Sequence, residues 1–203
     1  MDFYETVRLR RMVRNYDPRP VEDDKVDRIM AAARRGPSAG FSQGQSFVVV
    51  TQPETRQAIA TIMREEFYVG QGFDPWVSRA PVHIVCCTSE ELYVQRYSEP
   101  DKSAVPQKWP VPYWWVDAGA SLMLILLAAS AEGLAAGFLG TDAAGHGSLK
   151  TLLRIPSDVS TVGVVTIGYS APDRRSGSLK RGYRNIEDVV HRGEWRLSAT
   201  ADR

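Results

Sequence analysis

The sequence has few cysteine and histidine residues, which limits the chemistry that its side chains can perform. The 203-residue chain contains two cysteines and three histidines. Cys86 and Cys87 are adjacent in an apolar stretch, where a disulfide between neighbours would be strained because successive strand side chains point to opposite faces. We therefore expect two buried, reduced thiols in a cytoplasmic protein. His83, His146 and His191 stand apart from one another, so we predict no metal site.

The signature motifs of several enzyme classes are also missing. No HExxH, CxxC or GxSxG motif occurs, which argues against zinc hydrolysis and against serine hydrolysis from a nucleophile elbow. The glycine-containing stretch 137–147 has neither Rossmann nor Walker spacing, and it follows a predicted helix rather than a strand. We therefore expect no Rossmann dinucleotide-binding domain.

The chain has almost no excess of charge of either sign. Its 25 Lys and Arg residues stand against 24 Asp and Glu residues, so no overall field favours nucleic acid or an anionic membrane. The N-terminus is charged and lacks the apolar segment of a signal peptide. The most apolar stretch, 118–139, approaches the length of a membrane span, but Glu132, two serines and several glycines interrupt it. We predict a buried helix there, with neither a membrane nor a nucleic acid as partner.

Hydrophobic periodicity and turn residues predict helices and strands along the chain. Asp2 followed by Glu5 is typical of a capping box that opens a short helix through about Arg10. Further helices are predicted over 22–35, from Pro53 onward, over 112–133 and over 147–153. Strands are predicted over 46–51, 81–88 and 160–169. The proline-containing segment 89–112 has no clear period, and long segments of this kind are often lids or binding loops.

These elements predict one α+β domain, residues 1–203, in which helices flank a mixed sheet. The helices outnumber the strands, and the strands lie far apart in the sequence. The helix over 112–133 is too apolar around its circumference for the surface helix of a monomer. It is either enclosed within the domain or shared with a second copy of the chain. We expect a homodimer.

Two groups of polar residues near the N-terminus are candidates for binding. Arg10, Arg11 and Arg14 follow the first helix, and the planar fork of arginine suits a phosphate. The same pattern is typical of a solvated basic face. The loop 36–45 is made of small residues with an amide and hydroxyls, so a flat ligand could approach its backbone closely. An ordinary connection between a helix and a strand would have the same composition.

A third polar group and an aromatic group complete the candidates. The basic residues near the C-terminus are Lys180, Arg181 and Arg184. They either converge with the N-terminal arginines on one phosphate or form unrelated surface. Trp109, Tyr113, Trp114 and Trp115 precede or open the long apolar helix. They fit core and interface packing, or an aromatic wall that selects flat acceptors.

The order of these pieces resembles the nitroreductase family. The run 10–14 (RRMVR) is similar to the family's opening, in which a basic pair is followed by serine, any residue, and then arginine or lysine. The run 37–43 (PSAGFSQ) resembles the family's PSAxNxQ loop and stands directly before a Phe-Val-Val-Val strand. Segments 117–134, 139–156 and 184–190 (RNIEDVV) resemble the central dimer helix, the segments after it and the closing segment. The resemblance covers nearly the whole chain.

The resemblance implies an FMN cofactor and a set of residues that bind it. Arg10 and Arg11 would bind the flavin phosphate, together with Arg181 or Arg184, and Arg14 would lie at the pyrimidine edge of the ring. The other residues implied for flavin binding are Met12, Pro37, Ser38, Ala39 and Gln43, with Leu139 and Gly140 supplied by the partner subunit.

Two positions depart from the family's pattern. Met12 replaces a serine that touches the phosphate, and Phe41 replaces the usual asparagine near the ring. The second change puts the electronic environment of the ring and the choice of substrate in doubt. The residues implied to lie on the substrate side are Phe41, Tyr113 and Trp114.

The activity implied by the resemblance is ping-pong transfer of a hydride from NAD(P)H, through the flavin, to a nitroaromatic, a quinone or a similar flat acceptor. The flavin carries the redox step, so no catalytic side chain is predicted. Two alternatives remain open: reductive dehalogenation or flavin fragmentation on the same fold, and a protein that stores or senses FMN without turnover. NADH, NADPH and a reduced deazaflavin all remain possible donors.

Overall fold

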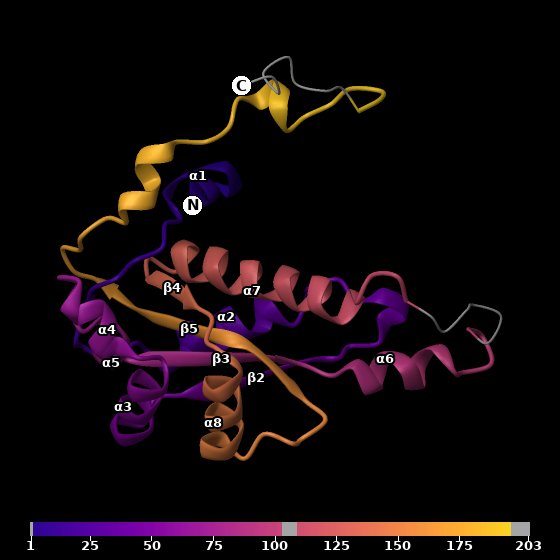
Figure 1. The fold of residues 1–203 in the computed structure, drawn as a ribbon, viewed down its shortest axis with the longest axis horizontal. Coiled ribbons are helices and arrows are strands. Elements are labelled where there is room, and N and C mark those ends of the chain that lie inside the picture. Colours follow the sequence, from indigo (N-terminus) through magenta and orange to yellow (C-terminus); the bar gives the residue numbers. More distant parts are fainter. Residues whose placement is uncertain (1, 103–108, 196–203) are drawn as a thin grey trace.

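A five-stranded sheet with helices on both faces forms the centre of the protein (Figure 1). The computed structural model describes residues 2–102 and 109–195. The strands are β1 (Tyr16–Asp17), β2 (Gln45–Val50), β3 (Val82–Thr88), β4 (Ala135–Leu139) and β5 (Ser160–Ser170). The α-helices are α1 (Phe3–Leu9), α2 (Asp23–Ala33), α3 (Pro53–Ile62), α4 (Glu65–Gly70), α5 (Trp76–Arg79), α6 (Glu90–Tyr97), α7 (Tyr113–Ala131) and α8 (Ala143–Leu153). Short 3-10 turns are η1 (Ala39–Phe41), η2 (Gly177–Arg181) and η3 (Ile186–Asp188).

The longest strand, β5, organises the sheet. The strand order is β1-β5-β3-β2, and β4 also pairs with β5. All of these pairs are antiparallel, whereas the sequence predicts a mixed sheet. One parallel bridge occurs among the described residues, between Met12 and Ala136, and it lies outside the named strands. The α+β class is confirmed, and the strand directions are corrected.

The long periodic elements were predicted well. The structure confirms the helix at the N-terminus, where the Asp2 carboxylate accepts hydrogen bonds from the backbone N–H groups of Tyr4 and Glu5 at 3.1 and 3.2 Å. It also confirms α2, α3, α7, β2, β3 and β5 close to the expected bounds. Helix α8 begins at residue 143, earlier than expected, because the Asp142 carboxylate caps it by accepting the N–H of Gly145 at 2.8 Å.

Some of the elements lie where the sequence shows no regular period. The segment 89–112 was predicted as a loop, but its first part is α6. Residues 103–108 of that segment lie outside the described residues. Helices α4 and α5 are too short to show a helical period. Strand β4 has the sequence AAGFL, without a β-branched residue, and its pairing with β5 makes it a strand.

The core has two halves, one on each face of the sheet. Strand β3 is buried along its whole length, because alternate side chains enter the two halves. Val82, Ile84 and Cys86 face a cluster that includes residues of α2 and α7. Val85 and Cys87 face a cluster built around α3, α5 and α8.

Both cysteines are free and buried, as predicted from the sequence. Burial raises the pKa of the Cys86 thiol to about 12 and that of the Cys87 thiol to about 11. Because the thiolate is the reactive form, burial makes both side chains poor nucleophiles. The pair therefore fits a role in packing, as small apolar side chains.

Helix α7 is only partly covered by its own chain. It packs against α2, the sheet and α1, and Ile125 and Ala129 are fully buried on its inner side. By length and composition it is apolar enough to cross a membrane, and it is the one such helix among the described residues. Its outer side exposes 53% of Val116 and 46% of Met123. Of the two arrangements that the sequence allows for this helix, complete enclosure within its own domain is therefore not the one observed.

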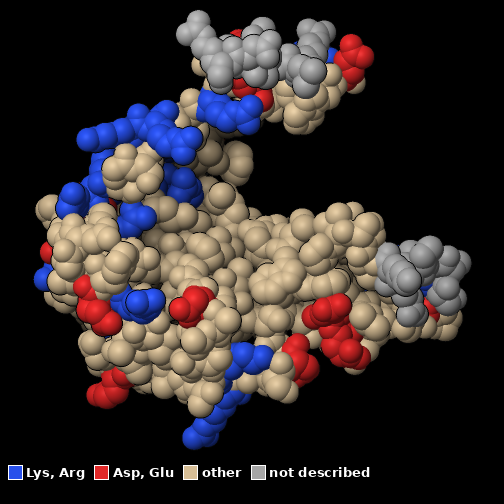
Figure 2. All heavy atoms as spheres, in the orientation of Figure 1, with Lys and Arg blue, Asp and Glu red and all other residues tan. Residues whose placement is uncertain are grey.

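The last described residues form an arm rather than a layer of the domain. This C-terminal arm (residues 172–195) runs past α1 and away from the sheet, on the same side as α7 (Figure 1). Figure 2 shows a wide recess between the arm and the face that carries α7, with Lys and Arg side chains gathered where the arm leaves the domain. The exposed apolar residues of the arm are Leu179, Tyr183, Ile186, Val189, Val190 and Trp195.

Candidate functional site

The basic segment after α1 is anchored to the edge of β4. The bridge at Met12 and the hydrogen bond from the N–H of Val13 to the carbonyl of Ala136, at 3.0 Å, hold its backbone. Val13 and Tyr16 are buried, and the Tyr16 hydroxyl shares a 2.9 Å hydrogen bond with the hydroxyl of Thr166. The apolar residues of the segment thus fix its position, while its arginine side chains remain partly or fully exposed.

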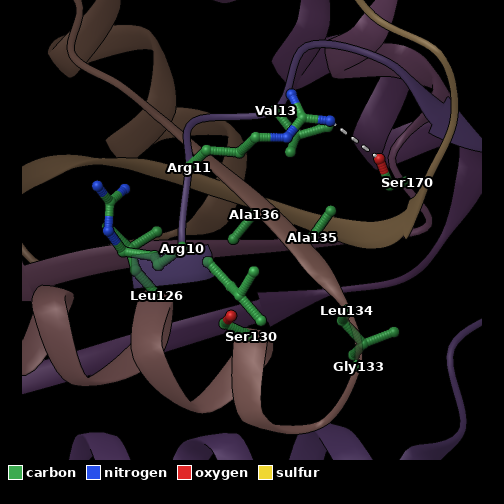
Figure 3. A pocket seen from close by; sticks show the side chains of 11 residues that line it. Arg10, Arg11, Val13, Leu126, Ser130, Gly133, Leu134, Ala135, Ala136 and Ser170 are labelled. Carbon is green, nitrogen blue, oxygen red and sulfur yellow. Dashed lines mark hydrogen bonds between the residues drawn. The ribbon is translucent and has the colours of Figure 1, made fainter. Parts of the chain in front are cut away.

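Arg10 and Arg11 lie at the rim of a hollow of about 240 Å³ that we call the Arg10 hollow (Figure 3). Its other walls come from the C-terminal part of α7, including Leu126 and Ser130, and from β4. The Arg11 guanidinium forms an ion pair of 2.6 Å with Asp173 and donates a hydrogen bond to the Ser170 hydroxyl. Its charge is therefore already partnered.

Arg14 lies in a second and larger hollow, which we call the basic hollow. Its volume is about 510 Å³, and its lining carries four basic side chains: Arg14, Arg174, Arg175 and Lys180. None of its lining residues is acidic. The guanidinium groups of Arg14 and Arg174 lie 5.7 and 5.4 Å from the centre of the Phe73 ring. This arrangement favours an anion, because four positive charges converge without a carboxylate among them.

A third hollow adjoins the basic hollow. This Gly140 hollow, of about 270 Å³, is lined on one side by Met63, Arg64, Phe67 and Tyr68 and on the other by Gly140, Thr141 and Asp142. Tyr68 also lines the basic hollow, so the two share a wall. Phe67 is 56% exposed, and no atom lies within 4 Å of the position that a side chain on Gly140 would take. A flat group can therefore approach the backbone here. Leu139 instead points into the core, with 6% of its surface exposed.

The loop 37–43 lies elsewhere, between α6 and the first turns of α7. Ser38 and Ala39 are half-buried, and Pro37 and Gln43 are exposed. Phe41 is 73% exposed.

Of the expected aromatic residues, Tyr113 is 39% exposed at the start of α7. The Trp114 ring packs edge-on against Tyr93 at 6.2 Å, which favours a packing role for Trp114. The Trp109 ring lies 4.4 Å from that of Tyr97 and 5.4 Å from that of Tyr113.

The structure therefore places the expected site residues in two groups at opposite ends of α7. Leu126 and Ser130, near the C-terminal end, line the Arg10 hollow, whereas Asp117, near the N-terminal end, binds the backbone of Ala39. Thirteen residues separate Asp117 from Ser130, which corresponds to about 20 Å along a helix axis. One copy of the chain does not bring the two groups together.

At the C-terminal end, Lys180 rather than its neighbours faces Arg14. Arg181 and Arg184 line none of the three hollows. Arg184 donates a hydrogen bond to the carbonyl of Asp188 at 2.7 Å, within the arm.

Several residues of these hollows have no recognisable motif in the sequence. Phe67, Tyr68 and Phe73 lie on or after the short helix α4, and Arg174 opens the arm beside them. In the sequence the aromatic residues follow Glu65 and Glu66 and lie far from Arg174, so no local pattern joins the two groups. Asp117 lies in the segment 117–134, whose pattern predicts a helix but not the hydrogen bond from Ala39 to its carboxyl group.

The sequence of the chain is similar to those of known proteins of one family. The model of the nitroreductase family matches residues 7–169. A protein of Archaeoglobus fulgidus named NADH dehydrogenase/NAD(P)H nitroreductase is 30% identical over 92% of this chain and 94% of its own length. Iodotyrosine deiodinase of Danio rerio is 24% identical over 93% of this chain and 66% of its own.

A solved structure shares the fold. The FMN-dependent nitroreductase of Clostridium difficile R20291 superimposes with a TM-score of 0.68 at 22% identity, over 94% of this chain and 98% of that one. The family model covers most of the chain, including the anchored basic segment, the loop 37–43 and the five strands up to the last residue of β5. The chain therefore belongs to the nitroreductase family of oxidoreductases.

Proposed function

We propose that the protein is an FMN-dependent oxidoreductase that takes a hydride from NAD(P)H and passes reducing equivalents to a flat aromatic acceptor. The observation that carries this proposal is the pair of adjoining hollows beside Tyr68. One carries four basic side chains and no acidic one, and the other offers an open backbone and exposed aromatic surface. FMN has the matching parts, an anionic phosphate and a flat ring.

In this proposal the residues of the basic hollow have different roles in binding FMN. Arg174, Arg175 and Lys180 would bind the phosphate, because charge-assisted hydrogen bonds from several cations suit a dianion. Arg11 contributes less than the sequence implies, because Asp173 already neutralises it. Arg10 has no such partner in the salt bridges of the described residues, and it stays a candidate phosphate ligand from the side of the Arg10 hollow. Met12 contributes through its backbone bridge.

The ring would lie over Gly140 in the neighbouring hollow, with the Arg14 guanidinium near its pyrimidine edge. Bound FMN would supply the chemistry of accepting and donating a hydride. Arg14 would stabilise the negative charge of the reduced ring, and Phe67 and Tyr68 would exclude water from one side. Arg14 is held for this task by its backbone hydrogen bond to Asp173 and by the Phe73 ring.

A second copy of the chain would complete the site. Arg14 and Gly140 line adjoining hollows of one chain. We therefore propose, in place of a partner that supplies Leu139 and Gly140, that the partner subunit contributes the loop 37–43. The exposed outer side of α7, with Val116 and Met123, gives the two copies an apolar surface to bury. The recess beneath the C-terminal arm in Figure 2 leaves room for that partner.

In such a dimer, Pro37, Ser38, Ala39 and Gln43 of one copy would approach the ring edge in the other. Phe41 and Tyr113 of that copy would contact the acceptor. Support for NAD(P)H as donor comes from the name of the Archaeoglobus fulgidus relative. The relation to iodotyrosine deiodinase makes reductive dehalogenation the second candidate. A cytoplasmic location fits a reduced pair of thiols.

An absorbance spectrum of the purified protein, followed by anaerobic addition of NADH or NADPH, tests the proposal. We expect flavin bands that either nucleotide bleaches and that a quinone or a nitroaromatic restores. Restoration by a halogenated phenol with release of halide, and not by the other acceptors, would favour the second candidate. A colourless protein that does not take up added FMN would rule out both, and bound flavin that neither nucleotide reduces would indicate storage or another donor.

A further inference from the structure

The backbone of residues 38–43, which we call the strained loop, adopts a conformation that its side chains disfavour. Gly40, Phe41 and Gln43 have φ angles of 62°, 57° and 52°. Glycine tolerates such angles, but Phe41 and Gln43 carry side chains that disfavour them. Such strain persists only where the surroundings impose it. The contacts of the loop therefore show what imposes it.

The first of these contacts is a buried carboxylate on α7. Oδ2 of Asp117 accepts the backbone N–H of Ala39 at 2.8 Å and the hydroxyl of Tyr93 at 2.8 Å. Asp117 is 6% exposed and Tyr93 is fully buried. No Lys or Arg forms an ion pair with Asp117 within the described residues. Hydrogen bonds from the loop and from α6, rather than a salt bridge, therefore satisfy this buried carboxyl group.

Tyr93 is a permanent donor in this arrangement. Burial raises the pKa of its hydroxyl well above the ordinary value, and the neighbouring Asp117 carboxylate raises it further. The ring of Tyr93 also fills the space beside Gly44, where no side chain would fit. Tyr93, on α6, thus contacts two other parts of the fold. Its ring packs beside Gly44, directly after the strained loop, and its hydroxyl binds Asp117 on α7.

The second set of contacts that hold the loop comes from the last turn of α6. Nε of Arg96 donates to the carbonyl of Gly40 at 2.9 Å, and both terminal nitrogens of its guanidinium bind Asp101 at 2.7 Å. A Cβ atom on Gly40 would lie 2.6 Å from the Tyr97 ring, so the loop and α6 are in close contact. Within the loop, the Ser38 hydroxyl accepts the N–H of Gln43 at 2.7 Å.

We propose that Asp117 is a positioning residue that holds the strained loop, through Ala39 and Tyr93, in the shape that presents Phe41 to the flavin site of a second copy. The inference rests on the proposed function. It adds that α7, the helix expected at the dimer interface, also sets the loop. When two copies associate through the exposed outer side of α7, the strained loop would therefore be positioned together with that helix. Asp117 itself would touch neither flavin nor substrate.

Three variants separate geometry from charge. Asp117→Asn keeps a carbonyl oxygen that can accept both hydrogen bonds, whereas Asp117→Ala removes the acceptor. Tyr93→Phe removes one of the two donors and leaves the loop contact intact. Glu65→Ala is a matched control, because Glu65 is also a buried carboxylate that accepts two backbone N–H groups, those of Val77 and Ser78, at 2.6 and 2.9 Å.

The first readout is hydrogen–deuterium exchange of residues 37–44 in flavin-free protein. We expect Asp117→Ala to speed exchange of the Ala39 amide about tenfold or more, because it removes the acceptor of that N–H. Asp117→Asn should have a smaller effect than Asp117→Ala, because its amide oxygen still accepts the N–H although more weakly than a carboxylate, and Tyr93→Phe should also lie between Asp117→Ala and the parent protein. Glu65→Ala should speed exchange around residue 77 and leave residues 37–44 unchanged.

The second readout is steady-state kinetics of the flavin-loaded protein. We expect Asp117→Ala to raise the acceptor KM several-fold while flavin content stays near that of the parent protein, and Asp117→Asn to restore the parent value. The proposal is wrong if Asp117→Ala leaves exchange in residues 37–44 unchanged, if Asp117→Asn behaves like Asp117→Ala, or if the loop loosens without any change in acceptor KM. A parent protein that binds no flavin would defeat the proposed function, while the exchange experiment would still decide whether Asp117 holds the loop.

Discussion

Arg11 and Arg14 bind the two oxygens of one carboxylate, that of Asp173. The Arg11 guanidinium donates to Oδ1 at 2.6 Å, and the backbone N–H of Arg14 donates to Oδ2 at 3.0 Å. The Asp173 side chain is 5% exposed. This carboxylate therefore fastens the beginning of the C-terminal arm to the segment after α1, and it brings Arg174 beside Arg14.

Removal of this carboxylate should cost stability and flavin affinity together. We expect Asp173→Ala to lower the free energy of unfolding by about 2 kcal/mol, because two partnered groups lose a charged acceptor. It should also weaken FMN binding, since the arm would no longer be held beside Arg14. Urea denaturation and a flavin titration measure the two effects. Asp74→Ala is the control, because its pair with Arg79 is about half exposed on both sides and should contribute less than about 1 kcal/mol. Equal losses in the two variants would contradict the role given to Asp173.

Arg14 and Lys180 line the same hollow but should contribute to different steps. We expect Arg14→Ala to slow flavin reduction by NAD(P)H more than it weakens FMN binding, because its charge would stabilise the reduced ring. Lys180→Ala should weaken binding of FMN but not of riboflavin, which lacks the phosphate. Stopped-flow reduction and fluorescence titration with both flavins distinguish the two. An unchanged reduction rate with lost FMN binding in Arg14→Ala would place Arg14 at the phosphate instead.

The sequence was sufficient for the elements whose period or capping is strong. Helix α2 has Val26 and Ile29 on one face, and β3 is mainly apolar with little alternation, so the usual patterns applied. Strand β4 was missed because alanine and glycine carry no strand signal, and its hydrogen bonds to β5 decide its conformation. The pairing of strands across long separations determines their direction. For that reason the antiparallel order did not follow from the local sequence.

Part of the candidate site was predictable from the sequence, because some of its residues belong to local patterns. The basic run at Arg10 and the loop at Pro37 have recognisable local patterns, so both were found. Their positions at opposite ends of α7 depend on the tertiary fold and were not predictable. In the C-terminal arm, Lys180, Arg181 and Arg184 lie within five positions of one another, and only the structure distinguishes Lys180 from the other two.

The exposed side of α7 should govern the oligomeric state. Met123 is 46% exposed on that side, and we expect Met123→Glu to weaken association of two copies at least tenfold by placing a charge in an apolar interface. Analytical ultracentrifugation over a range of concentrations measures the change. Leu152→Glu is the control, because Leu152 is 36% exposed on α8, on the opposite face of the sheet (Figure 1). If neither variant weakens association, the interface lies elsewhere. If both weaken it equally, the effect is not specific to the exposed side of α7.

His83 should make stability depend on pH in a defined direction. Its imidazole is fully buried in β3, and Nε2 lies 2.7 Å from the carbonyl of Val77, to which it can donate. Burial lowers the pKa of His83 to about 4 from 6.5, and the positive charge of Arg56 contributes in the same direction. The unfolded chain therefore takes up a proton on His83 as the pH falls through 6.5, whereas the folded protein does not until about pH 4.

Folding stability should consequently be complete above pH 6.5 and decrease between pH 6.5 and 4, by up to about 3 kcal/mol from this group. Urea denaturation at intervals across that range measures the slope. Carboxylates whose pKa is lowered in the fold, such as Glu132 paired with Arg28, also lose stabilisation at the acidic end, so the parent protein alone does not isolate His83. His83→Gln retains a donor for the Val77 carbonyl and has no titration in this range. Its stability should be flatter than that of the parent between pH 6.5 and 5, and parallel curves would show that His83 is protonated in the folded protein.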